Sequence, residues 1–174
     1  MKFCYADPPY LGNGASKYGY PEWDKKDRHF SLILELDLQY PDGWALSCNP
    51  KDLAWLLPVC GDKARVCPWV KTFHQIRSNV SVQYSWEPVI LKGGRPGGLK
   101  PMVRDWDETI IEVDDDPILK CARAMKKSLK GAKPDKFNDW ILLLLHYQPG
   151  DVLVDMFPGS NGMAAAILRA EGKA

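Results

Sequence analysis

Residues 151–162 read DVLVDMFPGSNG, and this stretch decides the fold that the sequence predicts. Residues 151–157 are apolar enough for a buried parallel strand, and residues 163–170 have the small and apolar side chains of a helix. The glycine-rich turn between them would bring free N–H groups and the positive end of the helix close to a phosphate or carboxylate. Glycines that only make a tight turn would give the same pattern, so this signal alone is weak.

A second strand and turn stand at the start of the chain. Residues 2–6 (KFCYA) form an apolar strand that ends at Asp7-Pro8-Pro9-Tyr10, because prolines cannot donate to a strand ladder. In open α/β sheets, ligands bind at the carboxyl ends of strands. The carboxylate and the rigid carbonyls accept hydrogen bonds, and Tyr10 offers a ring for stacking, so this loop suits an NH₂ group on a planar ring. An ordinary proline loop in which Asp7 caps the turn is the alternative.

Further strands alternate with helices along the chain, which favours an α/β fold class. Apolar strands are expected at 43–47, 63–69 and 84–91, and the last contains Pro88, which favours an edge position. Helical spacing of apolar residues occurs after residues 27–29, after Pro50 and in 135–145. From residue 92 the glycines, prolines, lysines and arginines indicate a flexible basic connector. The basic stretch 120–133 suits either phosphates or a solvated helix face.

Length and composition exclude several classes of protein. A chain of 174 residues fits one domain, and its apolar runs are too short for a membrane helix. The first residues do not have the pattern of a signal peptide. Five scattered cysteines without a Cys-x-x-Cys pair indicate reduced thiols in a cytoplasmic protein, with neither a disulfide framework nor a metal site. The net charge of +1 neither supports nor excludes nucleic acid.

Taken together, the motifs resemble those of the amino-directed DNA methyltransferases that use S-adenosylmethionine. Asp7-Pro8-Pro9-Tyr10 resembles their catalytic motif in the form typical of enzymes acting on adenine N6, and residues 155–162 resemble their cofactor loop. Residues 131–134 (GAKP) resemble a further cofactor segment, and Trp86-Glu87-Pro88 resembles a segment late in the catalytic half. The catalytic motif precedes the cofactor motif, which is the permuted order of the family's β group. The likeness is greatest to the small adenine methyltransferases of bacteriophages.

The resemblance implies a Rossmann-like methyltransferase fold with a mostly parallel, circularly permuted sheet in which the strand at 2–6 lies beside the strand at 151–157. It covers residues 1–174 as a single methyltransferase domain, with a short insert at 92–131 in the target-recognition position. Such a short insert implies short or relaxed sequence specificity. The strand that usually supplies an acidic residue to the cofactor ribose is missing after Ala174, so the cofactor half is expected to be truncated. A second chain, as in a homodimer, could complete it.

The resemblance also implies a role for each matching residue. Asp7 and the Pro8 carbonyl would accept the amine N–H groups, and Tyr10 would stack on a flipped base. Asn161 stands where the family usually has glycine; asparagine tolerates left-handed backbone but adds bulk beside the cofactor. No metal is required. The expected catalytic residues are Asp7, Pro8, Pro9 and Tyr10; the expected cofactor residues are Asp155, Phe157, Pro158, Gly159, Ser160, Asn161, Gly162, Lys133, Pro134 and Phe137; the expected substrate residues are Tyr18, Trp86, Glu87, Lys126, Lys127 and Lys130.

The implied activity is methyl transfer from S-adenosylmethionine to the N6 amino group of adenine in DNA, in the cytoplasm of a bacterial or phage-infected cell. Cytosine N4 is a close variant, since the same acceptors could serve it. Methylation of RNA or of a protein glutamine amide is a further alternative. A different class stays open as well, a catalytically weak DNA-binding relative that no longer holds the methyl donor.

Overall fold

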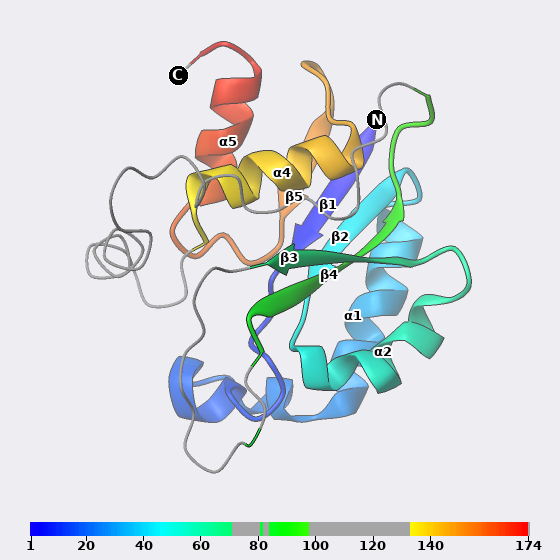
Figure 1. Ribbon diagram of the computed structural model, residues 1–174, viewed down its shortest axis with the longest axis vertical. Helices are drawn as coiled ribbons and strands as arrows, with labels where there is room; N and C mark the ends of the chain where they lie inside the picture. Colours follow the sequence, from blue (N-terminus) through cyan, green and yellow to red (C-terminus); the bar gives the residue numbers. More distant parts are fainter. Residues whose placement is uncertain (71–80, 82–83, 98–132, 174) are drawn as a thin grey trace.

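The computed structural model describes residues 1–70, 81, 84–97 and 133–173 (Figure 1). Its secondary structure follows the order β1 (Lys2–Ala6), η1 (Gly14–Tyr18), η2 (Pro21–Asp24), α1 (Lys26–Gln39), β2 (Gly43–Ser47), η3 (Pro50–Asp52), α2 (Leu53–Cys60), β3 (Arg65–Val70), β4 (Trp86–Gly93), α4 (Asp135–Leu145), β5 (Val152–Asp155) and α5 (Gly162–Ala170). The five strands form one sheet in the order β3-β4-β2-β1-β5. The predicted α/β class is confirmed.

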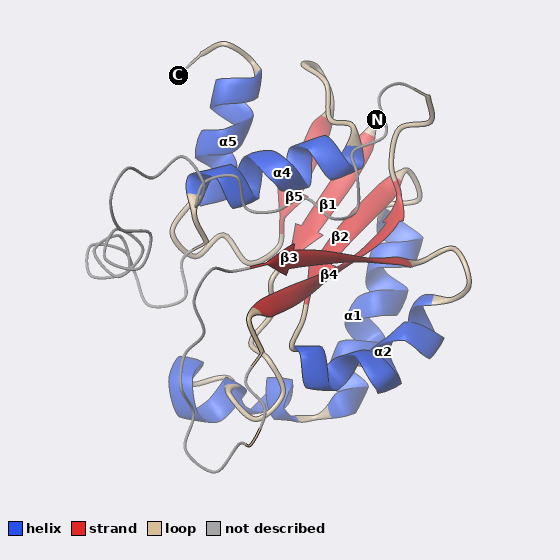
Figure 2. Ribbon diagram, viewed as in Figure 1, coloured by secondary structure: helices blue, strands red, loops and turns tan. Residues whose placement is uncertain are grey.

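Helices cover both faces of the sheet, with α1 and α2 on one face and α4 and α5 on the other (Figure 2). The alternation of side chains along β1 explains this arrangement, because neighbouring residues of a strand point to opposite faces. Phe3 and Tyr5 pack in the core under α4 and α5. Cys4 and Ala6 pack in the core against α1 and α2. All four side chains are buried, so β1 lies at the centre of the hydrophobic core.

The sheet is mixed but mostly parallel, as expected, because four of its five strands run in one direction and β4 runs against them. β1 pairs with β2 and with β5 in parallel, as expected from helical crossovers. β4, however, runs antiparallel to both β2 and β3. The apolar runs of these strands are the same in either direction, so their sequence predicted strands but not their orientation. The predicted adjacency of the first and last strands is confirmed by the pairing of Lys2–Tyr5 with Val152–Asp155.

β4 is an interior strand, whereas Pro88 had predicted an edge. It lies between β2 and β3 in the sheet. The register of β2 with β4 ends at the pair of Ser47 with Val89, so the N–H that Pro88 lacks would fall just beyond the ladder. The Pro88 carbonyl still accepts a hydrogen bond from the Cys48 N–H at 3.1 Å. The proline therefore costs the sheet almost no pairing.

β5 is shorter and more exposed than the predicted strand at 151–157. It spans Val152–Asp155 and lies at the end of the sheet, where Val152 is 54% exposed. An apolar run indicates burial on both faces but does not tell whether a second neighbouring strand is present. The turn that follows begins at Met156, whose N–H still donates to the Tyr5 carbonyl at 3.0 Å.

Residues 92–97 are packed, although the composition predicted a flexible connector from residue 92. Lys92 and Gly93 belong to β4. Lys92 forms an ion pair with Asp37 at 2.8 Å. The Arg95 guanidinium binds both carboxylate oxygens of Asp151 at 2.6 and 2.7 Å. The rest of the expected insert, 98–131, lies outside the described residues.

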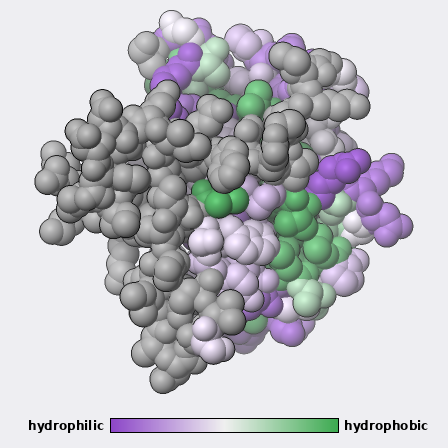
Figure 3. Space-filling model, in the orientation of Figure 1, coloured by the Kyte–Doolittle hydropathy of each residue, from purple (hydrophilic) through white to green (hydrophobic). Residues whose placement is uncertain are grey.

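Apolar and polar side chains share the surface. On the face shown in Figure 3, hydrophobic side chains gather right of centre and hydrophilic ones border them. In the part of the chain that the structure describes, no helix is both long enough and apolar enough to cross a bilayer. The four cysteines found there are buried free thiols.

The ion pair of Asp151 makes folding stability depend on pH. Its side chain is only 4% exposed, and although burial alone would raise its pKa, hydrogen bonds from Arg95, the Met1 ammonium and the Gln148 N–H lower it from 3.8 to about 2. A lowered pKa in the folded state contributes stability above pH 4, and that contribution is lost as the pH falls from about 4 to about 2. We expect Asp151→Asn to lower the free energy of unfolding by about 2 kcal/mol at pH 7.

Urea denaturation of the wild type and of Asp151→Asn at pH 7, 5, 4 and 3 measures this contribution. The difference in unfolding free energy between the two proteins should be constant from pH 7 to pH 5 and should shrink at pH 4 and pH 3. A difference that is equal at all four values would show that the charge of Asp151 is not what stabilises this corner of the fold.

Candidate active site

Parallel pairing of β1 with β5 brings the two sequence motifs to one edge of the sheet. Tyr5 lies opposite Asp155 in the register, and both strands end there. Asp7 follows the end of β1 by one residue, and its charge raises the pKa of Asp155, after the larger effect of burial. Carboxyl ends of neighbouring parallel strands are where ligands bind in sheets of this kind. Two motifs separated by about 150 positions thus form one candidate site.

The loop Asp7-Pro8-Pro9-Tyr10 is held close to the sheet. Pro8 and Pro9 are buried, while Asp7 and Tyr10 are partly accessible. The Tyr10 hydroxyl lies 3.3 Å from Asp7 Oδ1 and also 3.3 Å from Glu87 Oε2 on β4. The Tyr10 carbonyl accepts a hydrogen bond from the Asn13 N–H at 2.8 Å. The tyrosine is therefore fixed through its backbone and its hydroxyl.

Lys133 joins this loop from the segment just before α4. Its ammonium lies 2.9 Å from Glu87 Oε2, 3.2 Å from the Tyr10 hydroxyl and 3.6 Å from Asp7 Oδ1. Three aromatic rings surround the ammonium at 5.4–5.7 Å, those of Tyr10, Trp69 and Phe137. The resemblance had placed Lys133 on the cofactor side, but its contacts in the structure are with the acceptor loop and Glu87.

Burial and neighbouring charges set the protonation of this cluster. Burial raises the pKa of Asp7, Lys133 opposes that rise and Glu87 adds to it. Burial alone would lower the pKa of Lys133, but Asp7 and Glu87 raise it above 10.5. Burial and both carboxylates raise the pKa of Tyr10 well above 10, so its phenol stays protonated at neutral pH. The ammonium thus compensates two carboxylates.

The turn after β5 has the backbone that its glycines predicted. Gly159 has φ 45° and Asn161 has φ 59°, so asparagine adopts the left-handed conformation that the sequence analysis considered tolerable for it. Asp155 Oδ1 accepts a hydrogen bond from the Phe157 N–H at 3.1 Å, and burial raises its pKa. Pro158, Gly159, Ser160 and Asn161 are exposed, so the turn and the start of α5 are accessible to a ligand.

Close packing on α4 requires glycine at position 162. A Cβ atom there would lie 2.6 Å from the Asn138 side-chain nitrogen. Asn138 is 3% exposed, and its side chain donates to the Pro134 carbonyl at 3.3 Å. The Asn138 side chain therefore lies between the predicted segment at Pro134 and the predicted turn at Gly162. This side chain links two of the motifs that the sequence suggested for the cofactor.

The aromatic residues expected at the cofactor are packed in the core. Phe137 is 2% exposed and lies against Trp69 and Tyr5, with ring centroids 4.7 and 6.1 Å away. Phe157 packs edge-on against Trp23 at 5.1 Å, on the other face of the sheet. The two rings thus pack on opposite faces of the sheet.

The expected substrate residues do not all gather at the site. Glu87 contacts Tyr10 and Lys133, as described above. Trp86 is half-buried at the start of β4, edge-on to Tyr84. Tyr18 is 50% exposed on η1. Lys126, Lys127 and Lys130 lie outside the described residues.

The contact of Lys133 with the acceptor loop was missed by the sequence analysis. Asp7, Glu87 and Lys133 come from three distant parts of the chain, and no spacing in the sequence links them. The one signal available was the pattern of β4, in which Glu87 stands beside the apolar run 88–91. A charge at such a place usually has a partner, since an unpaired buried charge is costly.

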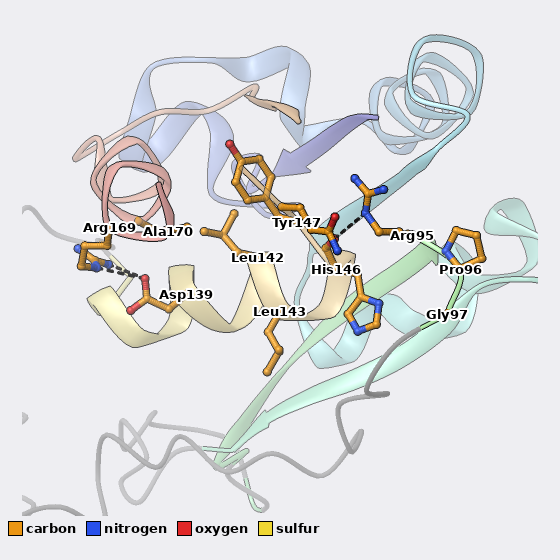
Figure 4. Close-up of a pocket in the computed structure, with 12 residues that line it drawn as sticks. Arg95, Pro96, Gly97, Asp139, Leu142, Leu143, His146, Tyr147, Arg169 and Ala170 are labelled. Carbon is orange, nitrogen blue, oxygen red and sulfur yellow. Dashed lines mark hydrogen bonds and ion pairs between the residues drawn. The ribbon is translucent and has the colours of Figure 1, made fainter. Parts of the chain in front are cut away.

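Figure 4 shows a hollow that lies away from the candidate site. It has a volume of about 760 Å³ and lies between α4, α5 and residues 95–97. Its charged side chains are already paired, Arg169 with Asp139 at 2.7 Å and Arg95 with Asp151. None of the predicted site residues lines it. Over the described ranges, no three His, Cys, Asp or Glu side chains gather as metal ligands would.

Comparison with known proteins identifies the fold. None of the protein-family models and none of the curated proteins match this chain. Among solved structures, the crystal structure of the M1.HpyAVI–SAM complex is similar, with a TM-score of 0.54 and 17% sequence identity. The alignment covers 98% of this chain and 78% of that chain. The mixed α/β sheet with its helices is therefore a fold that the two proteins share.

Proposed function

We propose that this protein transfers a methyl group from S-adenosylmethionine to the N6 amino group of adenine in DNA. One observation carries the proposal: the acceptor loop Asp7-Pro8-Pro9-Tyr10 and the turn after Asp155 lie at the ends of adjacent parallel strands. A methyl donor and its acceptor must meet within bonding distance, and this edge brings their two motifs together. The shared fold with M1.HpyAVI, whose structure is a complex with SAM, supports the choice of cofactor.

The residues at the turn fit S-adenosylmethionine. The exposed backbone from Pro158 to Asn161 and the start of α5 offer N–H groups to a carboxylate, and Asp155 is an acceptor for hydroxyl or amino groups. Glycine at 162 lets the turn pack on Asn138, which fixes its position. When bound, the cofactor supplies the methyl group from a positively charged sulfur. Pro134, Phe137, Phe157 and Ser160 complete the expected cofactor set.

The acceptor loop would hold and activate the target amine. An exocyclic amine conjugated to its ring is a poor nucleophile, so its N–H groups must be held while its lone pair points at the methyl group. The Asp7 carboxylate and the Pro8 carbonyl accept those N–H groups, and the Tyr10 ring stacks on a base turned out of the duplex. As nitrogen gains the methyl group it gives up one proton, for which Asp7 is the acceptor at hand.

The target base, the contacts with DNA and the location of the protein are the more detailed predictions. The same acceptors could serve cytosine N4. The basic residues Lys126, Lys127 and Lys130 would contact DNA phosphates, and the insert at 92–131 would give short or relaxed specificity. Four further points stay predictions. They are the permuted motif order, the likeness to bacteriophage enzymes, a homodimer, and a place in the cytoplasm of a bacterial or phage-infected cell.

Product identity tests the proposal directly. The protein is incubated with unmethylated DNA and S-adenosylmethionine, the DNA is digested to nucleosides, and methylated products are identified by mass spectrometry. We expect N6-methyladenine, and calorimetric titration should show binding of S-adenosylmethionine. N4-methylcytosine would change the target base. DNA binding with neither a methylated nucleoside nor cofactor binding would contradict the proposal and favour a DNA-binding relative.

A further inference from the structure

Two charged residues of the site take no part in the acceptor chemistry proposed above. Glu87 on β4 and Lys133 before α4 form an ion pair of 2.9 Å. Their side chains are 24% and 12% exposed, so water screens the pair only in part. Both touch the hydroxyl of Tyr10, at 3.3 and 3.2 Å. The pair therefore borders the acceptor loop directly.

The hydrogen bonds at the Tyr10 hydroxyl fix the orientation of its ring. A phenol donates one hydrogen bond and accepts from a second group. Lys133 only donates, so the Tyr10 oxygen accepts a hydrogen bond from its ammonium, and the Tyr10 hydrogen is shared between Asp7 and Glu87 at equal distances. Three groups from three segments thus hold one end of the ring.

The ammonium also balances the carboxylates. Asp7 and Glu87 face the same hydroxyl, and two nearby carboxylates without a cation tend to share a proton. Lys133 lies 3.6 Å from Asp7 and 2.9 Å from Glu87, and three aromatic faces add favourable contacts to the cation. The other titratable groups facing Asp7 are Tyr10 on its own loop and, from the strands, Tyr5 and Asp155. Among the described residues that face Asp7, Lys133 is the cation.

We propose that Lys133 and Glu87 are positioning residues: together they fix the Tyr10 ring, and Lys133 keeps the Asp7 carboxyl ionised, against the charge of Glu87, as the acceptor of the target amine. The use of an ionised Asp7 in methyl transfer rests on the proposed function. The effect of Lys133 and Glu87 on the charge of Asp7 rests only on the geometry of these side chains and that of Tyr10. It can therefore be tested without turnover.

The direct test is titration of the Asp7 carboxyl by NMR, with carbon-13 in the aspartate side chains and assignment through Asp7→Asn. Lys133→Met should raise the pKa of Asp7 by about one unit or more, because Asp7 then loses the nearby ammonium while the charge of Glu87 remains. Adding Glu87→Gln to Lys133→Met should reverse part of that rise. Glu87→Gln alone should lower the pKa of Asp7, and this second variant keeps the test valid if Lys133→Met does not fold.

The matched control is Lys92→Met, which removes an ion-paired lysine from β4 outside the site. It should leave the titration of Asp7 unchanged. An Asp7 titration that is the same in the wild type, Lys133→Met and Glu87→Gln would overturn the inference. So would a tenfold loss of S-adenosylmethionine affinity in Lys133→Met without a shift of Asp7, since Lys133 would then be a cofactor residue.

Activity measurements separate this inference from the proposed function. Since Asp7 must be ionised to accept the amine, Lys133→Met should move the acid limb of the pH profile of kcat/KM, which reports the free enzyme, to higher pH by the shift that NMR gives. Lys133→Arg should retain the wild-type limb. If the wild type makes no methylated product while the Asp7 shift occurs, the proposed function fails and the electrostatic role of Lys133 stands. A shifted Asp7 with an unmoved acid limb would overturn the positioning role.

Discussion

Replacing Asp7 by alanine is expected to lower the rate of methyl transfer about a thousandfold. The substitution removes a charged acceptor that lies at the end of β1, beside Tyr10 and Lys133. Without it the target amine keeps only the carbonyl acceptor of Pro8 and loses the carboxylate that takes the departing proton. Binding of S-adenosylmethionine should change little, because the turn after β5 holds the cofactor.

Single-turnover kinetics with saturating cofactor measures this loss, and calorimetry measures cofactor affinity in the same preparations. Asp62→Ala is the matched control, since it removes an exposed aspartate from the turn between α2 and β3. The control should have wild-type turnover. Unchanged turnover in Asp7→Ala would disprove the proposed mechanism, and loss of cofactor binding together with turnover would assign Asp7 to the cofactor instead.

Replacing Gly43 by alanine is expected to lower the free energy of unfolding by more than about 2 kcal/mol. Gly43 begins β2 and lies opposite Gly93 at the end of β4. A Cβ atom at Gly43 would lie 2.3 Å from the Gly94 nitrogen, and one at Gly93 would lie 2.7 Å from the Gly43 Cα. These neighbours are backbone atoms that cannot turn aside, so the two central strands would have to separate at this end.

Urea denaturation of the wild type, Gly43→Ala and Gly61→Ala measures this effect. Gly61 also has a positive φ, 78°, but a Cβ atom there would meet nothing within 4 Å. Its replacement should therefore show only the cost of the backbone conformation, about 1 kcal/mol. Equal losses in the two variants would contradict a steric role for Gly43.

Much of the local structure could be predicted because it depends on local rules. The apolar runs at 2–6 and 43–47 correspond to β1 and β2, and the helical spacing at 135–145 corresponds to α4. The prolines that follow Asp7 stand just after the end of β1, as the sequence suggested. The pairing of β1 with β5 was also expected, but through the resemblance of the motifs and not through any property of the two strands.

Position in the sheet could not be predicted in the same way. Pro88 had indicated an edge strand, yet β4 is interior, because its missing N–H falls just past the end of β2. The run at 151–157 had indicated a buried strand, yet β5 is shorter and lies at an edge. The polar or apolar character of a strand indicates which of its faces are buried, but not which strands lie beside it. Strand order follows from how the whole sheet packs.

The candidate site divides along the same line. Residues that are adjacent in the chain define the types of its groups: an acceptor loop with a carboxylate and an aromatic ring, and a glycine-rich turn at the start of a helix. The contacts of Glu87 and Lys133 with Asp7 and Tyr10 arise only when the chain is folded. Motifs follow from residue types that are adjacent in the chain. The contacts of Lys133 instead depend on where α4 packs on the sheet. Buried side chains that are far apart in the sequence together determine that position.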